Sequence, residues 1–392
     1  MLFRSKYVSA ALGAVEMITK GCTATYDMAV EFPAPTPEGV AAVAQAYADV
    51  GIRATIAPMI ADRTFYEAIP GLLAAVPASL RAQVDALRLA PAEQTIGVLR
   101  ETLRTWNHPR ERLRPAVGPT IPLHCSDEFM TACRDLAKEF DVGIQIHVAE
   151  SRLQAIVGQE RYGMSLTAHL NKLGLLGPKF TAAHSIWLHE PDIAMLADAG
   201  ASVAHNPGSN LRLGNGIAPV RRMRARGLNV GVGTDGASSA DNLNMFEATR
   251  LASFVSRVVD ELPERWISTR EALAMATMGS AHALGFEDIG RIAAGCRADI
   301  VFLDARHPNH APLNDAINQI VHAEDATAVR SVMIDGKLVV DDGRVTTIDV
   351  PRLIDRANEA AERLRQSRQS ARALVDQLEP IVSQVCGALG RV

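Results

Sequence analysis

The sequence predicts a parallel (β/α)8 TIM-type barrel, an α/β fold, with a small β-sandwich appendage and a helical C-terminal tail. Strand-like and helix-like segments alternate over most of the chain, and polar residues interrupt several strands near their carboxyl ends. Short alternating strands follow from about Gly295. Alternation at this spacing is typical of parallel strands joined by helical crossovers. We therefore expect a barrel over residues 1–294, a β appendage that forms part of a composite sandwich over 295–350, and a helical tail over 351–392.

The barrel segments can be assigned in order. The chain begins with an amphipathic helix over residues 1–21, which lacks the arrangement of a signal peptide. Two later helices, over 36–51 and 126–141, begin at Thr36 and Ser126, whose side chains can cap free backbone N–H groups. Strands are predicted over residues 23–30, 53–62, 113–122, 143–150, 180–188, 201–209 and 229–237.

The strand count is one short of a closed barrel. Seven strands are visible in the sequence, whereas a (β/α)8 barrel has eight, so the first strand is expected to be missing at the N-terminus. An open, doubly wound sheet of seven strands is the alternative. No GxGxxG turn or Walker lysine supports a nucleotide-binding sheet of that kind.

The last hundred residues differ from the barrel in their predicted secondary structure. Two Asp-Gly pairs, Asp335-Gly336 and Asp342-Gly343, predict tight turns between short strands of the appendage. In the tail, an apolar stripe is expected to pack on the barrel or on a second copy of the chain, which makes a homodimer the expected assembly. The stripe comprises Leu364, Leu374, Leu378, Ile381, Val382 and Val385.

Composition excludes several classes of function. The formal net charge is −4 without a long block of like charge, which argues against a nucleic-acid or membrane-surface partner and favours a small-molecule ligand. No apolar run reaches the roughly 18 residues of a membrane span. The five cysteines are scattered and form no CxxC pair, so neither a disulfide framework nor a cysteine zinc site is expected, and a cytoplasmic location is.

One predicted strand carries chemistry at its end. In IQIHVAES, alternation places Ile144 and Ile146 on the face toward the helices, and Gln145 and His147 on the face toward the barrel interior. His147 lies near the carboxyl end, where barrel active sites are built. Glu150 follows where the chain turns, so its carboxylate can reach the same mouth.

Two later strands repeat this placement. His184 lies late in the strand over 180–188, and Asp235 ends the strand over 229–237. A single strand histidine is more often structural, and an Asp-Gly pair is often only a turn. Three such interruptions at strand ends favour a site for a divalent metal with an open position for water.

Further polar residues are weaker candidates for substrate contacts. His205, Asn206 and Asn210 follow the strand over 201–209, and these residues could line a pocket or form a loop tied by its own side chains. His124 follows an earlier strand, and Gln145 shares the inward face of His147. No GxSxG motif supports a serine nucleophile.

The strings HVAE, AHS around His184, HNPGSNLRLGNGIAPV and GTDGASSADNLNMFE together resemble the amidohydrolase superfamily, in its cytosine-deaminase-like branch of aromatic deaminases and triazine hydrolases. The resemblance implies that one divalent ion, zinc or alternatively iron, is bound by His147, His184 and Asp235. It also implies that Asp235 accepts a proton from the attacking water, Glu150 passes a proton to a ring nitrogen, and His184 polarises water or substrate. The family's His-x-His pair on the first strand has no counterpart in this sequence, so weakened metal affinity is expected.

The implied activity is that of a hydrolase acting on a C–N bond of an aromatic heterocycle, a deaminase of a purine, pterin, pyrimidine or related ring. Within enzymes, a triazine-type chlorohydrolase is the alternative. Outside enzymes, the alternative is a non-catalytic or truncated barrel that binds a ligand or partner without turnover.

Overall fold

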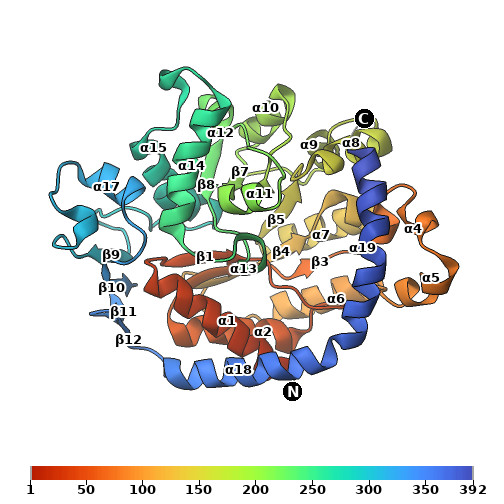
Figure 1. Ribbon diagram of the computed structural model, residues 1–392, viewed down its shortest axis with the longest axis horizontal. Coiled ribbons are helices and arrows are strands. Elements are labelled where there is room, and N and C mark those ends of the chain that lie inside the picture. The colour runs from red at the N-terminus through yellow and green to blue at the C-terminus, as the bar shows by residue number, and fades with distance from the viewer. Residues whose placement is uncertain (1, 391–392) are drawn as a thin grey trace.

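The computed structural model describes residues 2–390, and its main sheet is parallel and curled, with helices on its outer side (Figure 1). The strands hydrogen-bond in the order β1-β2-β4-β5-β6-β7-β8, and β3 pairs with β4. Neighbours in space are neighbours in sequence, without the reversal that defines a doubly wound sheet, so the barrel-type prediction is confirmed. The strands are β1 Ala24–Asp27, β2 Arg53–Ile56, β3 Met59–Ile60, β4 Leu113–Pro119, β5 Gly143–Val148, β6 Phe180–His184, β7 Ser202–His205 and β8 Asn229–Val232.

Each predicted barrel strand has a counterpart, with one interruption. The segment over 53–62 is divided into β2 and β3, because Pro58 lies between them and has no N–H to donate to a sheet. No pairing joins β1 to β8 within residues 2–390, so these two strands form the ends of the curled sheet. The missing first strand stays a prediction.

Helices connect and cover the strands. The two predicted caps are present: the Thr36 hydroxyl accepts a hydrogen bond from the backbone N–H of Gly39 at 3.0 Å, and the Ser126 hydroxyl accepts one from that of Phe129 at 3.1 Å. The helices before the appendage are α1 Leu2–Thr19, α2 Pro37–Val50, α3 Phe65–Ala68, α4 Leu72–Ala75, α5 Ala78–Asp85, α6 Ala92–Arg104, α7 Asp127–Phe140, α8 Arg152–Tyr162, α9 Leu166–Lys172, α10 Glu190–Asp198, α11 Pro207–Arg212, α12 Val220–Ala225, α13 Ala237–Ala240, α14 Met245–Val259, α15 Thr269–Ala274 and α16 Ser280–Ala283. Short helical turns of other types are η1 Pro122–His124, η2 Pro263–Arg265, the π-helical η3 Met275–Gly279 and η4 Pro308–His310.

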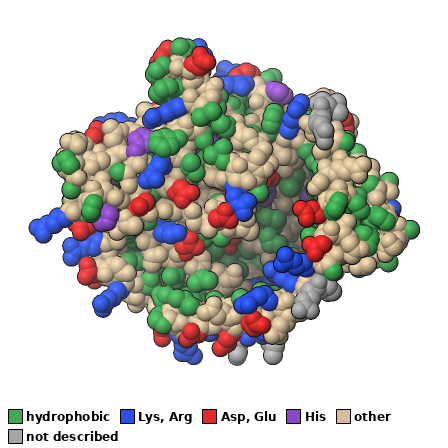
Figure 2. All heavy atoms as spheres, in the orientation of Figure 1, with side chains coloured by type: hydrophobic (Ala, Val, Ile, Leu, Met, Phe, Trp, Pro, Cys, Tyr) green, Lys and Arg blue, Asp and Glu red, His purple; other side chains and the backbone are tan. Residues whose placement is uncertain are grey.

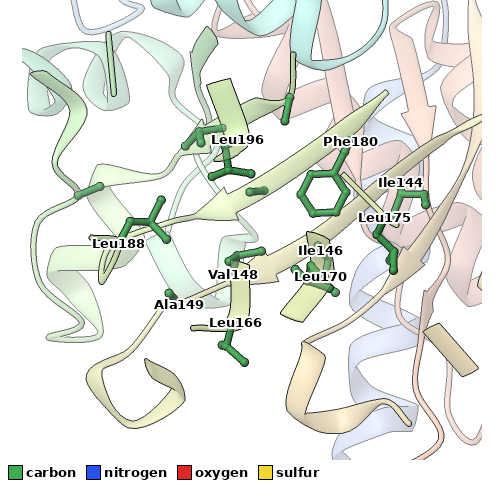
Figure 3. Packing of buried hydrophobic residues seen from close by; sticks show 14 of the residues in the cluster. Ile144, Ile146, Val148, Ala149, Leu166, Leu170, Leu175, Phe180, Leu188 and Leu196 are labelled. Carbon is green, nitrogen blue, oxygen red and sulfur yellow. The ribbon is translucent and has the colours of Figure 1, made fainter. Parts of the chain in front are cut away.

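Alternation along β5 separates the core from the cavity. Ile144, Ile146 and Val148 belong to the main hydrophobic core, between the sheet and its covering helices (Figure 3). Gln145 and His147, on the other face, line the central cavity. The predicted division of this strand into an apolar and a polar face is therefore confirmed.

The appendage is an antiparallel sheet in the order β12-β11-β10-β9. Both Asp-Gly turns occur where they are predicted, and all four turn residues have positive φ, between 46° and 77°. This is the backbone geometry of tight hairpin turns. The elements are β9 Ile300–Leu303, α17 Ala316–His322, β10 Val329–Ile334, β11 Lys337–Asp341 and β12 Arg344–Val345.

A buried ion pair connects the appendage to the barrel. Arg53 on β2 is fully buried and binds both carboxylate oxygens of Asp299, at 2.9 and 2.8 Å. A bidentate guanidinium–carboxylate pair fixes distance and orientation together. Asp299 also accepts a hydrogen bond from the backbone N–H of Asp335, so the pair orients a hairpin turn of the appendage against β2.

The tail consists of two helices, α18 Val350–Ser367 and α19 Gln369–Leu389. Figure 1 shows α18 beside α1 and α19 beside α4, so the tail encloses one side of the barrel. Leu378 of the predicted stripe is buried against Val76, Leu80 and Val84, whereas Leu364 is 44% exposed. Among the described helices, none is long and apolar enough to cross a membrane.

Candidate functional site

A cavity of about 890 Å³ opens at the carboxyl ends of the barrel strands. Its mouth is visible as a hollow in the face shown in Figure 2. Residues of β1 and β8 line it, and His147, Glu150, His184 and Asp235 all contribute to its lining. The volume lies in the range of small-molecule sites. The structure thus brings the four predicted strand-end residues to one cavity.

His147 projects into this cavity from β5 with one ring nitrogen already bonded. Its Nδ1 lies 2.6 Å from the carbonyl oxygen of Thr120. A carbonyl can only accept, so Nδ1 carries the proton, and the neutral ring presents the Nε2 lone pair to the cavity. Burial lowers the pKa of His147, and the nearby charge of His184 lowers it further. Both effects favour the neutral imidazole that binds metal ions.

His184 reaches the cavity in a different way. On β6, Thr181 and Ala183 line the cavity, so regular alternation would direct His184 outward. The backbone of His184 is instead left-handed, with φ 64°, and the side chain lies inside. Its ring stacks on that of His147 at 5.3 Å, and its Nδ1 lies 2.9 Å from Asn210 Oδ1. This bond again leaves Nε2 as the free nitrogen.

Two carboxylates lie close to the free nitrogen of His184. Glu150 Oε1 lies 3.8 Å from His184 Nε2, and Asp235 Oδ2 lies 3.9 Å from the same atom. Ligand atoms of His147, Glu150 and His184 all lie within 4.8 Å of one another. This group of three includes Glu150, whereas the sequence-based metal set includes Asp235.

Backbone strain is concentrated around these residues. Besides His184, the non-glycine residues Ala149, Ser185 and Asp235 have positive φ, of 48°, 54° and 65°. A left-handed conformation costs a residue with a Cβ about 1–2 kcal/mol. Such strain is characteristic of functional sites whose surroundings hold the backbone in place.

The donor set fits a divalent metal ion. Two imidazoles offer their Nε2 atoms, each with Nδ1 bonded to a fixed acceptor, and carboxylate oxygens lie beside them. Such bonds to the outer nitrogen are the usual means of orienting histidine ligands. Imidazole and carboxylate ligands with space for water are typical of catalytic zinc sites, and the same ligands suit iron.

Two of the five predicted substrate contacts line the cavity, and three do not. Gln145 and Asn206 line the cavity, and Gln145 Oε1 is buried without a hydrogen-bond partner. His124, His205 and Asn210 lie outside the lining. Asn210 contacts His184, and burial, followed by the charges of His147 and Arg161, lowers the pKa of His124 to about 4. His205 is fully buried, and neither of its ring nitrogens has a partner.

Three residues of the site were not predicted: Thr120, Gln154 and Asn215. Thr120 acts through its carbonyl oxygen, which no side-chain pattern reveals. Gln154 and Asn215 both donate hydrogen bonds to Glu150. Asn215 lies between Gly214 and Gly216, and that Gly-Asn-Gly string is the sequence feature that could have identified it as a site residue.

The curled parallel sheet, the antiparallel appendage and the His and carboxylate cluster define a barrel hydrolase of the amidohydrolase type. The family profile described as "Amidohydrolase family" matches residues 4–339. The chain belongs to this family.

Relatives and solved structures agree with this assignment. The 5'-deoxyadenosine deaminase of Methanothermobacter thermautotrophicus is 32% identical over 362 residues, which cover 91% of this chain and 76% of that protein. The 5'-deoxyadenosine deaminase of Methanosarcina mazei is 36% identical over 263 residues, and the match spans 67% of this chain and 60% of that relative. The structure of atrazine chlorohydrolase TrzN from Arthrobacter aurescens TC1, complexed with zinc, is 27% identical, with a TM-score of 0.81 over 90% of this chain and 76% of TrzN.

Proposed function

We propose that this chain is a metal-dependent aminohydrolase that deaminates an aromatic heterocycle, with an adenosine derivative as the first substrate class to test. The observation that carries the proposal is the convergence of His147, Glu150 and His184 within 4.8 Å at the floor of an 890 Å³ cavity. The activity after which the two relatives are named, deamination of 5'-deoxyadenosine, supports the substrate class.

His147, His184 and Asp235 would hold the ion, for which we propose zinc, with iron as the alternative. When bound, a divalent ion supplies Lewis-acid chemistry toward water at this position. Thr120 and Asn210 keep the two imidazoles in the tautomer that presents Nε2. His147 and His184 would therefore act as oriented donors toward the ion.

Two carboxylates have separate roles in the proposed reaction. Asp235 accepts the proton of the attacking water, and Glu150 delivers a proton to the ring nitrogen beside the reacting carbon. A C–O bond forms, the amino group takes the proton held by Asp235, and the exocyclic C–N bond breaks to release ammonia. The proton of the new hydroxyl group returns to Glu150 as the ring carbonyl forms. Gln145 and Asn206, on the cavity wall, would contact the ring.

The test is ammonia release by the zinc-supplemented protein from a panel of 5'-deoxyadenosine, guanine, a pterin, cytosine and an s-triazine amine. We expect release from at least one ring, and a fall of about 10²–10⁴-fold in Glu150→Gln with metal content unchanged, because proton delivery is lost. Near-normal turnover in Glu150→Gln would show that Glu150 does not transfer the proton. Saturable binding of a heterocycle without release would instead support the non-catalytic barrel.

A triazine-type chlorohydrolase is the second candidate, favoured by the similarity to the TrzN structure. The same cavity and donor set would serve displacement of chloride from a ring carbon. Chloride release from atrazine without ammonia release from any amino heterocycle would favour this candidate.

The remaining assignments are also proposals. We propose residues 1–294 as the hydrolase barrel, 295–350 as the β appendage and 351–392 as the tail, of which residues 391–392 lie outside the described part. A homodimer through the tail is proposed because Val375 and Leu364 expose apolar surface there. All five cysteines are free, and the cytoplasmic location stays a prediction.

A further inference from the structure

The carboxylate of Glu150 is held by two amide side chains, one on each oxygen. Asn215 Nδ2 donates to Oε1 at 3.3 Å, and Gln154 Nε2 donates to Oε2 at 3.2 Å. We propose that Asn215 and Gln154 are positioning residues that form a clamp on Glu150 and fix the direction in which it presents its proton. The inference rests on the proposed function for the role of Glu150, and on the contacts alone for the clamp itself.

Gln154 holds both the backbone and the side chain of Glu150. Its Oε1 accepts a hydrogen bond from the Glu150 backbone N–H at 3.1 Å, while its Nε2 binds the carboxylate. The first turn of α8 fixes Gln154 in turn, because the capping hydroxyl of Ser151 accepts from the Gln154 backbone N–H at 3.2 Å. Gln154 is only 8% exposed, so solvent competes little for these bonds.

Asn215 approaches from the opposite side on a loop with a defined shape. It lies between Gly214 and Gly216, whose φ values of 67° and 113° favour glycine. A Cβ added at Gly216 would lie 3.2 Å from Ile186 and 3.6 Å from the ring of Trp187, so this loop packs closely on the segment after β6. The Trp187 indole N–H donates to the Asn215 carbonyl at 2.8 Å. This bond holds the backbone of Asn215, whose side-chain amide reaches Glu150.

The clamp selects one orientation of a flexible side chain. With Oε2 bound to Gln154, Oε1 is directed toward the interior and lies 3.8 Å from His184 Nε2. An amide N–H can donate to the carboxylate but cannot compete as a base, so the clamp orients Glu150 without exchanging protons with it. Proton transfer is sensitive to displacements of about 1 Å, so a carboxylate fixed in advance reacts faster than a mobile one.

The test is a double-mutant cycle. Asn215→Ala and Gln154→Ala are each made in the wild-type chain and in a Glu150→Ala background. For each single variant we expect kcat to fall about 10–100-fold while KM changes less than about threefold, and metal content to stay constant. In the Glu150→Ala background the same changes should cause no further loss, because no carboxylate remains to be oriented.

Unfolding measurements give a readout that does not require activity. If the clamp forms, the unfolding free energies of Asn215→Ala and Glu150→Ala are not additive. Asn229→Ala is the control, since its amide donates hydrogen bonds to Ser202 and to the Gly279 carbonyl, but none to Glu150. Its effects should be additive with those of Glu150→Ala.

The outcomes separate the two proposals. Additive unfolding for both amide variants, or an equal loss of kcat in both backgrounds, would overturn the clamp. Non-additive unfolding in a protein that releases ammonia from no heterocycle would support the clamp and count against the proposed function.

Discussion

The ends of β6 and β7 have nearly the same sequence and opposite geometry. Each strand ends in Ala-His, at Ala183-His184 and Ala204-His205, and Ala183 pairs directly with Ala204. His184 has φ 64° and enters the cavity, where it contacts Asn210 and lies beside two carboxylates. His205 is not among the positive-φ residues, lies outside the cavity lining and has no partner for either nitrogen.

The sign of one backbone dihedral therefore separates a candidate ligand from a buried side chain. Alternation directs the last residue of both strands away from the cavity, because Ala183 and Ala204 line it. Only the left-handed turn at His184 reverses this direction. We therefore expect the two positions to differ in three respects: the effect of substitution on enzyme activity, the effect of pH on stability, and the cost of the local backbone conformation.

Removal of each histidine should produce the largest difference. We expect His184→Ala to lower kcat/KM about 10³-fold, or ~4 kcal/mol, because the site loses the proposed metal ligand and water-polarising group. His205→Leu, which places an apolar side chain of similar size at this buried position, should change kcat/KM less than about threefold. Ammonia release measured on both variants checks the difference, and equal losses would show that the cavity does not distinguish the two residues.

The stability of the protein should depend on the titration of His205. Burial, followed by the charge of His184, lowers the pKa of His205 from 6.5 to about 3. Between pH 6.5 and 3 the unfolded chain thus binds a proton that the folded chain does not, so the free energy of unfolding falls as the pH falls. The loss is on the order of 4 kcal/mol at pH 3 and is absent above pH 6.5.

Urea unfolding at pH 7, 5 and 4 measures this loss. The His205→Leu variant should show a shallower decline than the wild type across that window. An identical decline in both proteins would mean that His205 accepts a proton in the folded state.

Asn210 should matter through His184. Asn210→Ala removes the acceptor for Nδ1–H and releases the tautomer, so we expect zinc affinity and kcat/KM to fall about 10–100-fold. Asn210→Asp retains an acceptor oxygen and should recover most of the loss. Chelator competition measures the affinity, and failure of Asp to restore it would point to packing rather than tautomer control.

The smallest effect concerns the backbone next to His184. Ser185 has φ 54°, is fully buried and has no partner for its hydroxyl. Ser185→Gly removes both costs and should raise the unfolding free energy by about 1–2 kcal/mol. Asn206→Gly, at the corresponding position after His205 with φ −115°, gains no such relief and should not stabilise the protein. Denaturant unfolding of both variants tests the pair.

Much of this arrangement could be predicted from local sequence. Alternation in Ile144–Val148 indicates which side of β5 faces the cavity, because β5 is a regular strand. The capping residues Thr36 and Ser126 and the Asp-Gly turns at Asp335 and Asp342 also depend only on neighbouring residues, and the structure confirms them. The position of four residues near strand ends was enough to predict that they share one cavity: His147, Glu150, His184 and Asp235.

The rest depends on contacts between distant segments. His184 faces inward because of its left-handed backbone dihedral, and no local sequence pattern predicts that dihedral. For the same reason, the sequence predicts that His205 contacts the substrate, although its side chain lies outside the cavity lining. The Asn215–Glu150 bond joins residues 65 positions apart, and the Arg53–Asp299 pair joins residues 246 apart. The division of the strand over 53–62 is different, because it follows from the local effect of Pro58, whose missing N–H was not taken into account in the predicted range.

We propose that His184, turned inward, completes a metal site with His147 and Asp235. A zinc-binding titration against a competing chelator tests this most directly, on the wild type, His184→Ala and His205→Leu. We expect about one zinc per chain in the wild type and His205→Leu, and at least about tenfold weaker binding in His184→Ala. Equal zinc affinity in all three proteins, or no zinc binding by the wild type, would contradict it.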